Sequence, residues 1–223
     1  MRNTVLLLAA VLCLVGCSPE TPTVPASEAL PVASFPSALD PDCRDGRARI
    51  YDECGAQAAI LAAALEQARA TGKTVIVNYG AEWCIWCHVF DNHLRGATGR
   101  FNYPVEGEEV TLIERSGREV LNDARAVNEF ASNNFVVAHI EADFAPDGRQ
   151  VLEATGAVAH FEESYPFIFA VTAEGQFATA FEHEAVEQRR DTAGDWYRGY
   201  DRVELLAELR RMRQEASRGA SSQ

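Results

Sequence analysis

The chain has 223 residues and a formal net charge of −13, with 33 acidic and 20 basic side chains. A surface this acidic disfavours binding to nucleic acid and direct adhesion to anionic lipid, because both carry negative charge. The length suits one domain with short terminal segments.

The first 17 residues have the pattern of a leader that is removed rather than folded. Arg2 precedes an apolar run over 5–15, and about 11 residues are too few to span a bilayer, which takes roughly 20. The run ends in Leu14-Val15-Gly16-Cys17, which resembles the lipobox of bacterial lipoproteins. This resemblance implies cleavage before Cys17, acylation of Cys17 and, from Ser18, sorting to the outer membrane. An ordinary secretory signal with a chance cysteine is the alternative, and both interpretations predict export.

Residues 18–42 are rich in Pro, Ser, Thr and Ala and lack hydrophobic periodicity. Such a segment buries too little apolar surface to offset its ordering entropy. We therefore expect a tether that, at roughly 3 Å per residue, would hold a domain several tens of ångströms from a membrane. The domain itself is expected over 43–217, followed by a flexible tail over 218–223.

Hydrophobic periodicity predicts alternating helices and strands in this domain. Helices are expected where apolar residues recur every three or four positions, and strands where β-branched and aromatic residues run together. In chain order the expected elements are a helix over 52–71, a buried strand over 73–79, a helix over 86–94, two short strands within 110–121 about a Ser-Gly turn, a helical piece over 123–132, a strand over 135–143, a helix over 147–155, a hairpin of strands over 166–172 and 176–181, and a helix over 202–215. The order predicts an α/β fold whose central mixed sheet is flanked by helices.

Four cysteines lie beyond the leader and its cleavage site, and in an oxidising compartment they can pair in three ways. The simplest pairing joins Cys43 to Cys54 and Cys84 to Cys87. A Cys43–Cys54 bridge would close a short loop and stabilise the fold by about 3 kcal/mol in the chain-entropy model. A second redox pair is the alternative for these two cysteines.

The string Cys84-Ile-Trp-Cys87-His88 allows three kinds of chemistry: a redox disulfide, attachment of c-type haem and half of a zinc site. Haem usually needs a second axial ligand. Met212 is expected to be a core residue. None of the four remaining histidines lies in a setting typical of a haem ligand; they are His93, His139, His160 and His183. Zinc needs two further ligands, and Cys43 and Cys54 lack knuckle spacing. We therefore expect no metal and no cofactor beyond the disulfide, with copper capture by the pair and a histidine as a minor alternative.

Several segments together resemble the thioredoxin superfamily. KTVIVNYGAEWCIWCHVFDNHL, over 73–94, resembles its central strand, WCxxC motif and active-site helix, and FVVAHIEADF resembles the next strand. Tyr165-Pro166 falls where the family places a cis-proline beside the redox pair. The resemblance covers about 75–95 and 134–215 and implies a thioredoxin-like fold with an insertion over about 96–122, which could cover the site, shape a partner surface or be inert.

The resemblance implies roles for the motif residues. Cys84 would be the nucleophile, its pKa lowered by the helix start, and Cys87 would resolve the mixed disulfide. Residues expected to form an apolar rim or to bind an extended substrate chain are Trp83, Trp86, Tyr165 and Pro166.

One departure from the family concerns proton handling. Asn78 stands where the family has a buried acid, and asparagine cannot accept a proton. Glu82 is a substitute candidate, although we expect it to be an exposed loop residue. His88 could stabilise a thiolate or relay a proton, although a solvated position on the helix is the favoured interpretation.

The sequence thus predicts a thiol–disulfide oxidoreductase, lipid-anchored in the bacterial envelope and facing the periplasm. It would act on protein or peptide disulfides and draw electrons from an unidentified donor. The uncharged Ile85-Trp86 between the cysteines favours a reductant over a strong oxidant. The alternative, favoured by Asn78, is a non-catalytic thioredoxin-fold module that binds a partner or a metal.

Overall fold

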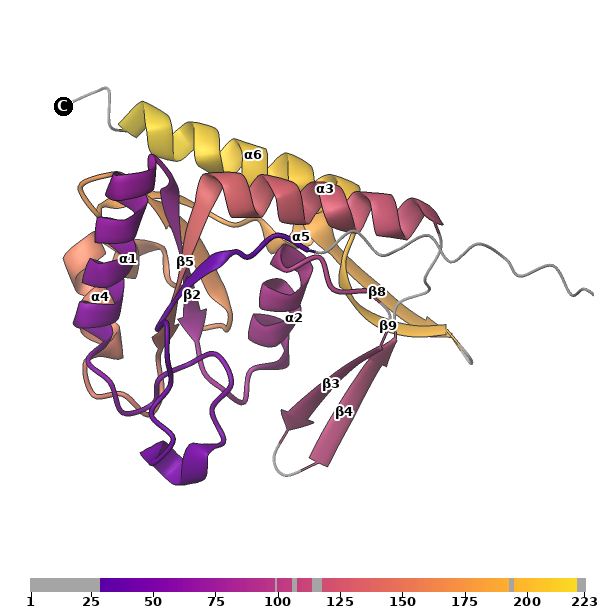
Figure 1. Cartoon of the computed structure of the whole chain (residues 1–223), viewed down its shortest axis with the longest axis horizontal. Helices are drawn as coiled ribbons and strands as arrows, with labels where there is room; N and C mark the ends of the chain where they lie inside the picture. Colours follow the sequence, from indigo (N-terminus) through magenta and orange to yellow (C-terminus); the bar gives the residue numbers. More distant parts are fainter. Residues whose placement is uncertain (1–28, 99, 106–107, 114–117, 193–194, 220–223) are drawn as a thin grey trace, which may run out of the picture.

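The computed structural model describes residues 29–98, 100–105, 108–113, 118–192 and 195–219 (Figure 1). The expected leader, the first part of the expected tether and the Ser-Gly turn at 116–117 lie outside these ranges. Within them, no helix combines the length and apolarity needed to cross a membrane.

The centre of the fold is a five-stranded mixed sheet with the strand order β1-β5-β2-β6-β7. Its strands are β1 (Ala33–Phe35), β2 (Thr74–Gly80), β5 (Phe135–Glu141), β6 (Phe167–Val171) and β7 (Phe177–Ala180). Strands β1, β5 and β2 are parallel, whereas β6 and β7 are antiparallel to their neighbours. Every residue of β2 and β5 is buried, which explains why both are mostly apolar without an alternating pattern.

Helices cover both faces of this sheet (Figure 1). They are α1 (Gln57–Thr71) and α4 (Gly148–Thr155) on one face and α2 (Ile85–Leu94), α3 (Arg118–Asn134) and α6 (Arg202–Gly219) on the other. Alternate residues of β2 serve the two cores, since Val75 and Val77 pack with α1 while Ile76 packs with α2, α3 and α6. The expected α/β, thioredoxin-like fold is confirmed.

The insertion after α2 differs from the sequence expectation. Strands β3 (Arg100–Val105) and β4 (Glu108–Ile113) form a separate antiparallel pair, and α3 already begins at Arg118. The prediction of two strands about the Ser-Gly turn was therefore wrong for the second strand. The buried positions Ala124, Val127 and Ala131 recur at helical spacing, and this periodicity extends the helix back towards 118.

Three further parts of the structure differ from the sequence prediction. A second hairpin, β8 (Glu187–Thr192) and β9 (Asp195–Tyr200), follows the short α5 (His183–Val186) and was not predicted. Strand β1 lies within the segment expected to be a tether, because Ala33–Phe35 pair with β5. Helix α1 begins at Gln57 rather than at 52, because the Asp52 carboxylate accepts the N–H groups of Cys54 and Gly55 and so forms a turn.

Short 3₁₀ helices complete the fold. They are η1 (Cys43–Gly46), in the loop before α1, and η2 (Ala157–His160), which follows α4.

The packing of α6 on the sheet predicts a position-dependent loss of stability. Leu209→Ala removes a fully buried side chain and is expected to lower the free energy of unfolding by about 2–5 kcal/mol. Val203→Ala, on the exposed side of the same helix, should change it by roughly 0.5 kcal/mol or less. Urea denaturation of the purified protein measures both, and equal losses would contradict this placement of α6.

Candidate active site

The Cys84–Cys87 pair lies where β2 passes into α2. Cys84 is the N-cap of α2, with an extended backbone, and its Sγ accepts the N–H of Cys87 at 3.2 Å. The two cysteines form a disulfide with a Cα–Cα distance of 5.3 Å. Cys84 is 4% exposed and Cys87 0%, so an attacking thiolate can reach Cys84 more readily. The helix start also provides N–H groups and a partial positive charge that favour a thiolate at Cys84.

Aromatic side chains surround the exposed edge of the pair. Trp86 and Tyr165 pack against the cluster that contains both cysteines. Trp83 is 46% exposed, meets Tyr165 edge to face and donates from Nε1 to Asp143 Oδ2 at 3.1 Å. The Tyr165–Pro166 peptide is cis. The structure therefore brings the four residues expected at the rim to the same end of the sheet.

Glu82 and His88 differ from the sequence expectation, because both are buried. Glu82 Oε2 accepts the N–H groups of Ile50 and Tyr51 at 3.1 Å each. His88 Nε2 lies 2.6 Å from the backbone oxygen of Glu82 and 3.3 Å from Glu82 Oε1. The expectations of an exposed loop carboxylate and a solvated histidine were thus wrong, since the loop before α1 binds Glu82 and Glu82 contacts His88.

The pKa of Glu82 reflects this pairing. Burial alone would raise the pKa of the Glu82 carboxyl, but His88 and backbone N–H groups lower it below its usual value. Glu82 is consequently an ionised anchor rather than a proton carrier in the neutral range.

Asn78 connects the active-site helix to the sheet. Its Nδ2 donates to the backbone oxygen of Cys87 at 3.3 Å and lies 3.3 Å from His139 Nδ1. His139 Nε2 is in turn 3.2 Å from Asp91 Oδ1, and Asp91 Oδ2 accepts from Arg95 Nε at 2.6 Å. Burial opposes ionisation of Asp91, but His139 and Arg95 lower its pKa to about 2. This chain of contacts holds a charged acid near the site without placing one at position 78.

Glu141 is a site residue that was not predicted. It ends β5 opposite Gly80, is fully buried, and accepts the N–H groups of Asp143, Phe144 and Glu82. Burial raises the pKa of Glu141 to about 7 in spite of these donors. An acid at the last position of a buried strand, beside the strand that leads to the cysteines, is the signal that could have found it.

Tyr51 is the second residue that was not predicted. It is fully buried, packs against Cys84 and Cys87, and meets the His139 ring edge to face at 5.5 Å. It belongs to the loop closed by the Cys43–Cys54 disulfide, whose Cα–Cα distance is 5.9 Å. The Cys43–Cys54 pairing is the one expected from the sequence. No local sequence pattern, however, predicts that the loop between these cysteines packs against the active site.

The described residues contain no group of three or more His, Cys, Asp and Glu side chains placed to hold a metal ion. His93 is buried against the Val89 oxygen and the Tyr197 hydroxyl, and His160 stacks on Phe177. Met212 is buried in the core, as expected.

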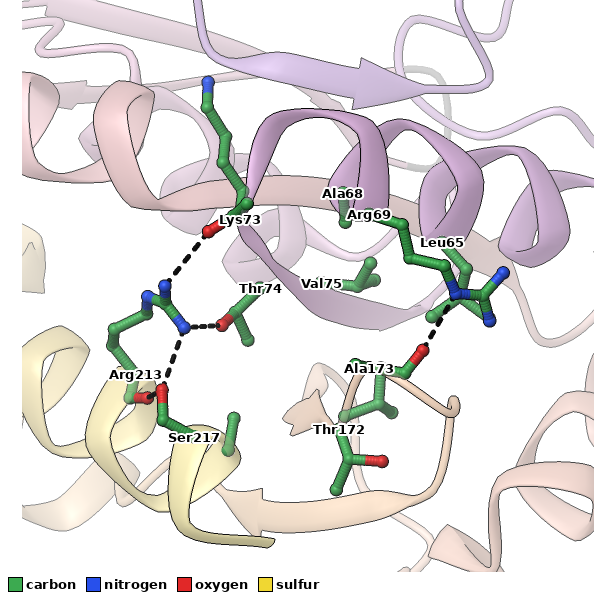
Figure 2. Close-up of a pocket in the computed structure, with 13 residues that line it drawn as sticks. Leu65, Ala68, Arg69, Lys73, Thr74, Val75, Thr172, Ala173, Arg213 and Ser217 are labelled. Atoms are coloured by element: carbon green, nitrogen blue, oxygen red, sulfur yellow. Dashed lines mark hydrogen bonds between the residues drawn. The ribbon is translucent and has the colours of Figure 1, made fainter. Parts of the chain in front are cut away.

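A cavity of about 400 Å³ lies at the opposite end of β2 from the cysteines (Figure 2). Arg213 donates to Thr74 Oγ1, to Ser217 Oγ and to the backbone oxygen of Gly72. Arg69 Nε donates to the Ala173 oxygen at 3.0 Å. These guanidinium groups connect the ends of α1 and α6 to the start of β2 and to the β6–β7 turn. Their contacts within the fold therefore account for the presence of both arginines at this cavity.

Comparison with known proteins agrees with the geometry. Residues 57–95 match the model of a family described as thioredoxin-like, a span that covers α1, β2, α2 and both active-site cysteines. Together with the fold, the match supports placing the chain in the thioredoxin superfamily. Searches of curated proteins and of solved structures found no significant match.

The raised pKa of Glu141 predicts a pH-dependent contribution to stability. Between the unfolded value of 4.5 and the folded value of about 7 the native protein binds more protons at this group, so stability is lost as the pH rises through this window. The difference in free energy of unfolding between wild type and Glu141→Gln should therefore fall from pH 4.5 to pH 7 and level off above it. Urea denaturation of both proteins across this range measures the difference, and a flat or rising one would contradict the assignment.

Proposed function

We propose that the protein is a thiol–disulfide oxidoreductase that acts on protein or peptide disulfides through Cys84 and Cys87. The observation that carries the proposal is the disulfide at the start of α2, with Cys84 as N-cap and the cis Tyr165–Pro166 peptide at the same end of the sheet. The thioredoxin-like match over this segment supports it further.

In the proposed reaction the reduced protein attacks a substrate disulfide with the Cys84 thiolate. One substrate sulfur becomes bonded to Cys84 and the other leaves as a thiolate, which takes up a proton. Cys87 then loses its proton and attacks Cys84 Sγ, which forms the Cys84–Cys87 disulfide and releases the second substrate thiolate. That thiolate also takes up a proton, so the substrate gains two electrons and two protons, and an electron donor of the thiol class must restore the dithiol.

The surroundings of the pair support reduction over strong oxidation. Strong oxidants in this class have a highly stabilised thiolate in the reduced form. Here the carboxylates of Glu82 and Asp91, whose pKa values are lowered, lie near Tyr51, which packs against both cysteines, and the residues between the cysteines are uncharged. Negative charge near Cys84 opposes thiolate formation, so the pair should give up electrons more readily than a strong oxidant does.

The apolar rim supports a polypeptide substrate. Exposed Trp83 beside Tyr165 offers apolar contact, and the backbone at Tyr165-Pro166 is suited to an extended chain. The leader and Cys17 support export and lipid anchoring in the envelope, with the domain facing the periplasm.

Replacing the resolving cysteine tests the activity. Cys87→Ser should accumulate mixed disulfides on Cys84 in the native envelope, because the second step is blocked, whereas Cys84→Ser should accumulate far fewer. Non-reducing electrophoresis and mass spectrometry of purified conjugates measure the outcome. A non-catalytic binding module would give no conjugates with either variant, and its wild-type disulfide would fail to exchange with dithiothreitol.

Replacing Cys17 tests the anchor. Cys17→Ser should abolish incorporation of radiolabelled palmitate and move the protein from the membrane fraction to the soluble fraction of the envelope, because the acylated thiol is lost. Equal labelling of wild type and Cys17→Ser would contradict lipidation at this residue.

A further inference from the structure

The hydroxyl group of Tyr51 is buried without a partner. The side chain is 0% exposed, and among the described residues none forms a hydrogen bond with Tyr51 Oη. A buried hydroxyl left unpaired destabilises a fold by about 1–3 kcal/mol. Phenylalanine would fill the same volume without that penalty, so packing alone does not account for the hydroxyl group.

The hydroxyl group and the sulfur of Cys87 both lie against Gly80. A Cβ atom on Gly80 would be 2.4 Å from Cys87 Sγ and 3.0 Å from Tyr51 Oη. The sulfur and the hydroxyl oxygen thus border the same small space, which only glycine at position 80 leaves free. Tyr51, Cys84 and Cys87 form one buried cluster.

Contacts that do not involve the Cys84–Cys87 disulfide fix the position of Tyr51. Glu82 binds its N–H group and that of Ile50, and the ring lies edge-on to His139. The Cys43–Cys54 disulfide closes the loop that carries it. The hydroxyl group therefore keeps its place whether the Cys84–Cys87 bond is closed or open.

Burial and the surrounding charges keep the hydroxyl group protonated. Burial, followed by the carboxylates of Glu141, Glu82 and Asp91, raises the pKa of Tyr51 well above its usual value. A protonated phenol can donate a hydrogen bond to a thiolate, which an ionised carboxylate cannot do. Asn78 does not supply this donor, because its Nδ2 bonds the backbone oxygen of Cys87.

We propose that the Tyr51 hydroxyl group donates a hydrogen bond to the sulfur of Cys87 when the active-site disulfide opens. The proposal rests on the proposed oxidoreductase function and assigns Tyr51 to its resolving step. Cys87 gives up its proton to water and, as a thiolate, attacks Cys84 Sγ; the Cys84–Cys87 disulfide forms as the bond between Cys84 and the substrate sulfur breaks, and the leaving substrate thiolate takes up a proton from water. Tyr51 keeps its own proton throughout and stabilises the negative charge on Cys87 before the attack.

Tyr51→Phe tests the proposal in a single-turnover reaction of the reduced full chain, purified in detergent, with glutathione disulfide. Acid quenching and mass spectrometry follow the mixed disulfide on Cys84 as it forms and then resolves. Its formation rate should stay within about twofold of wild type, whereas its resolution should slow by about tenfold or more, because a hydrogen bond to a charged group is lost. Tyr79→Phe is the matched control, since it removes a hydroxyl group from a buried ring in the core beneath α1 and keeps the ring that meets Tyr165; it should leave both rates unchanged.

The outcomes separate the two proposals. Wild-type protein that never forms the mixed disulfide would contradict the oxidoreductase function itself. Wild-type protein that forms and resolves it, with Tyr51→Phe resolving it equally fast, would overturn only the role of Tyr51. Melting temperatures of the oxidised proteins check folding.

A measurement on wild-type protein gives a test that needs no variant. The ring ¹³Cζ resonance of Tyr51, which responds to hydrogen bonding by the hydroxyl group, should shift on reduction of the protein, while that of Tyr79 should not. An unchanged Tyr51 resonance would contradict the proposal.

Discussion

The arrangement of the active site depends on the buried carboxylate of Glu82. It binds two backbone N–H groups of the loop before α1 and the ring of His88 in α2, so one side chain joins the start of the active-site helix to a loop some 30 residues earlier in the chain. A buried charge without partners would strongly destabilise the fold. The loop at Ile50 and Tyr51 must therefore close over the site for Glu82 to be tolerated there, and the Cys43–Cys54 disulfide limits the freedom that this closure removes.

This constraint gives a physical reason for asparagine at position 78. Asp91, Glu82 and Glu141 already bring three carboxyl groups close to Tyr51, which packs against both cysteines, and burial raises the pKa of Glu141 to about 7. A fourth acid on β2 would lie next to the Asp91–His139 pair and would repel a thiolate. A neutral amide at this place instead joins Cys87 to His139 by hydrogen-bonding contacts, so the sheet supports α2 without adding charge.

The sequence predicts the helices and strands of the central sheet better than it predicts the contacts of the active site. Strands β2 and β5 and helix α2 follow from local runs and periodicity, and the cysteines, Trp86 and Tyr165 follow from the motif and the proline strand. The burial of Glu82 and His88 could not be predicted, because it depends on a loop some 30 residues earlier in the chain. Tyr51 was missed for the same reason, since it belongs to that loop, whereas Glu141 could have been found as an acid at the end of a buried strand. The start of α3 was missed because β-branched and apolar residues at 110–121 favour strand locally.

The parallel pairing of β1 with β5 affects how the domain would carry a load. Leu30 exchanges two hydrogen bonds with Asn128, and β1 begins three residues later. The redox pair follows the carboxyl end of β2, which runs in the same direction as β1 and β5. In the proposed lipid-anchored protein, a pull from the anchor through residue 30 while the proposed substrate is bound at Cys84 would apply opposed forces along the strand axis. The ladder between β1 and β5 would then be loaded in shear, so that its hydrogen bonds share the force instead of opening one at a time.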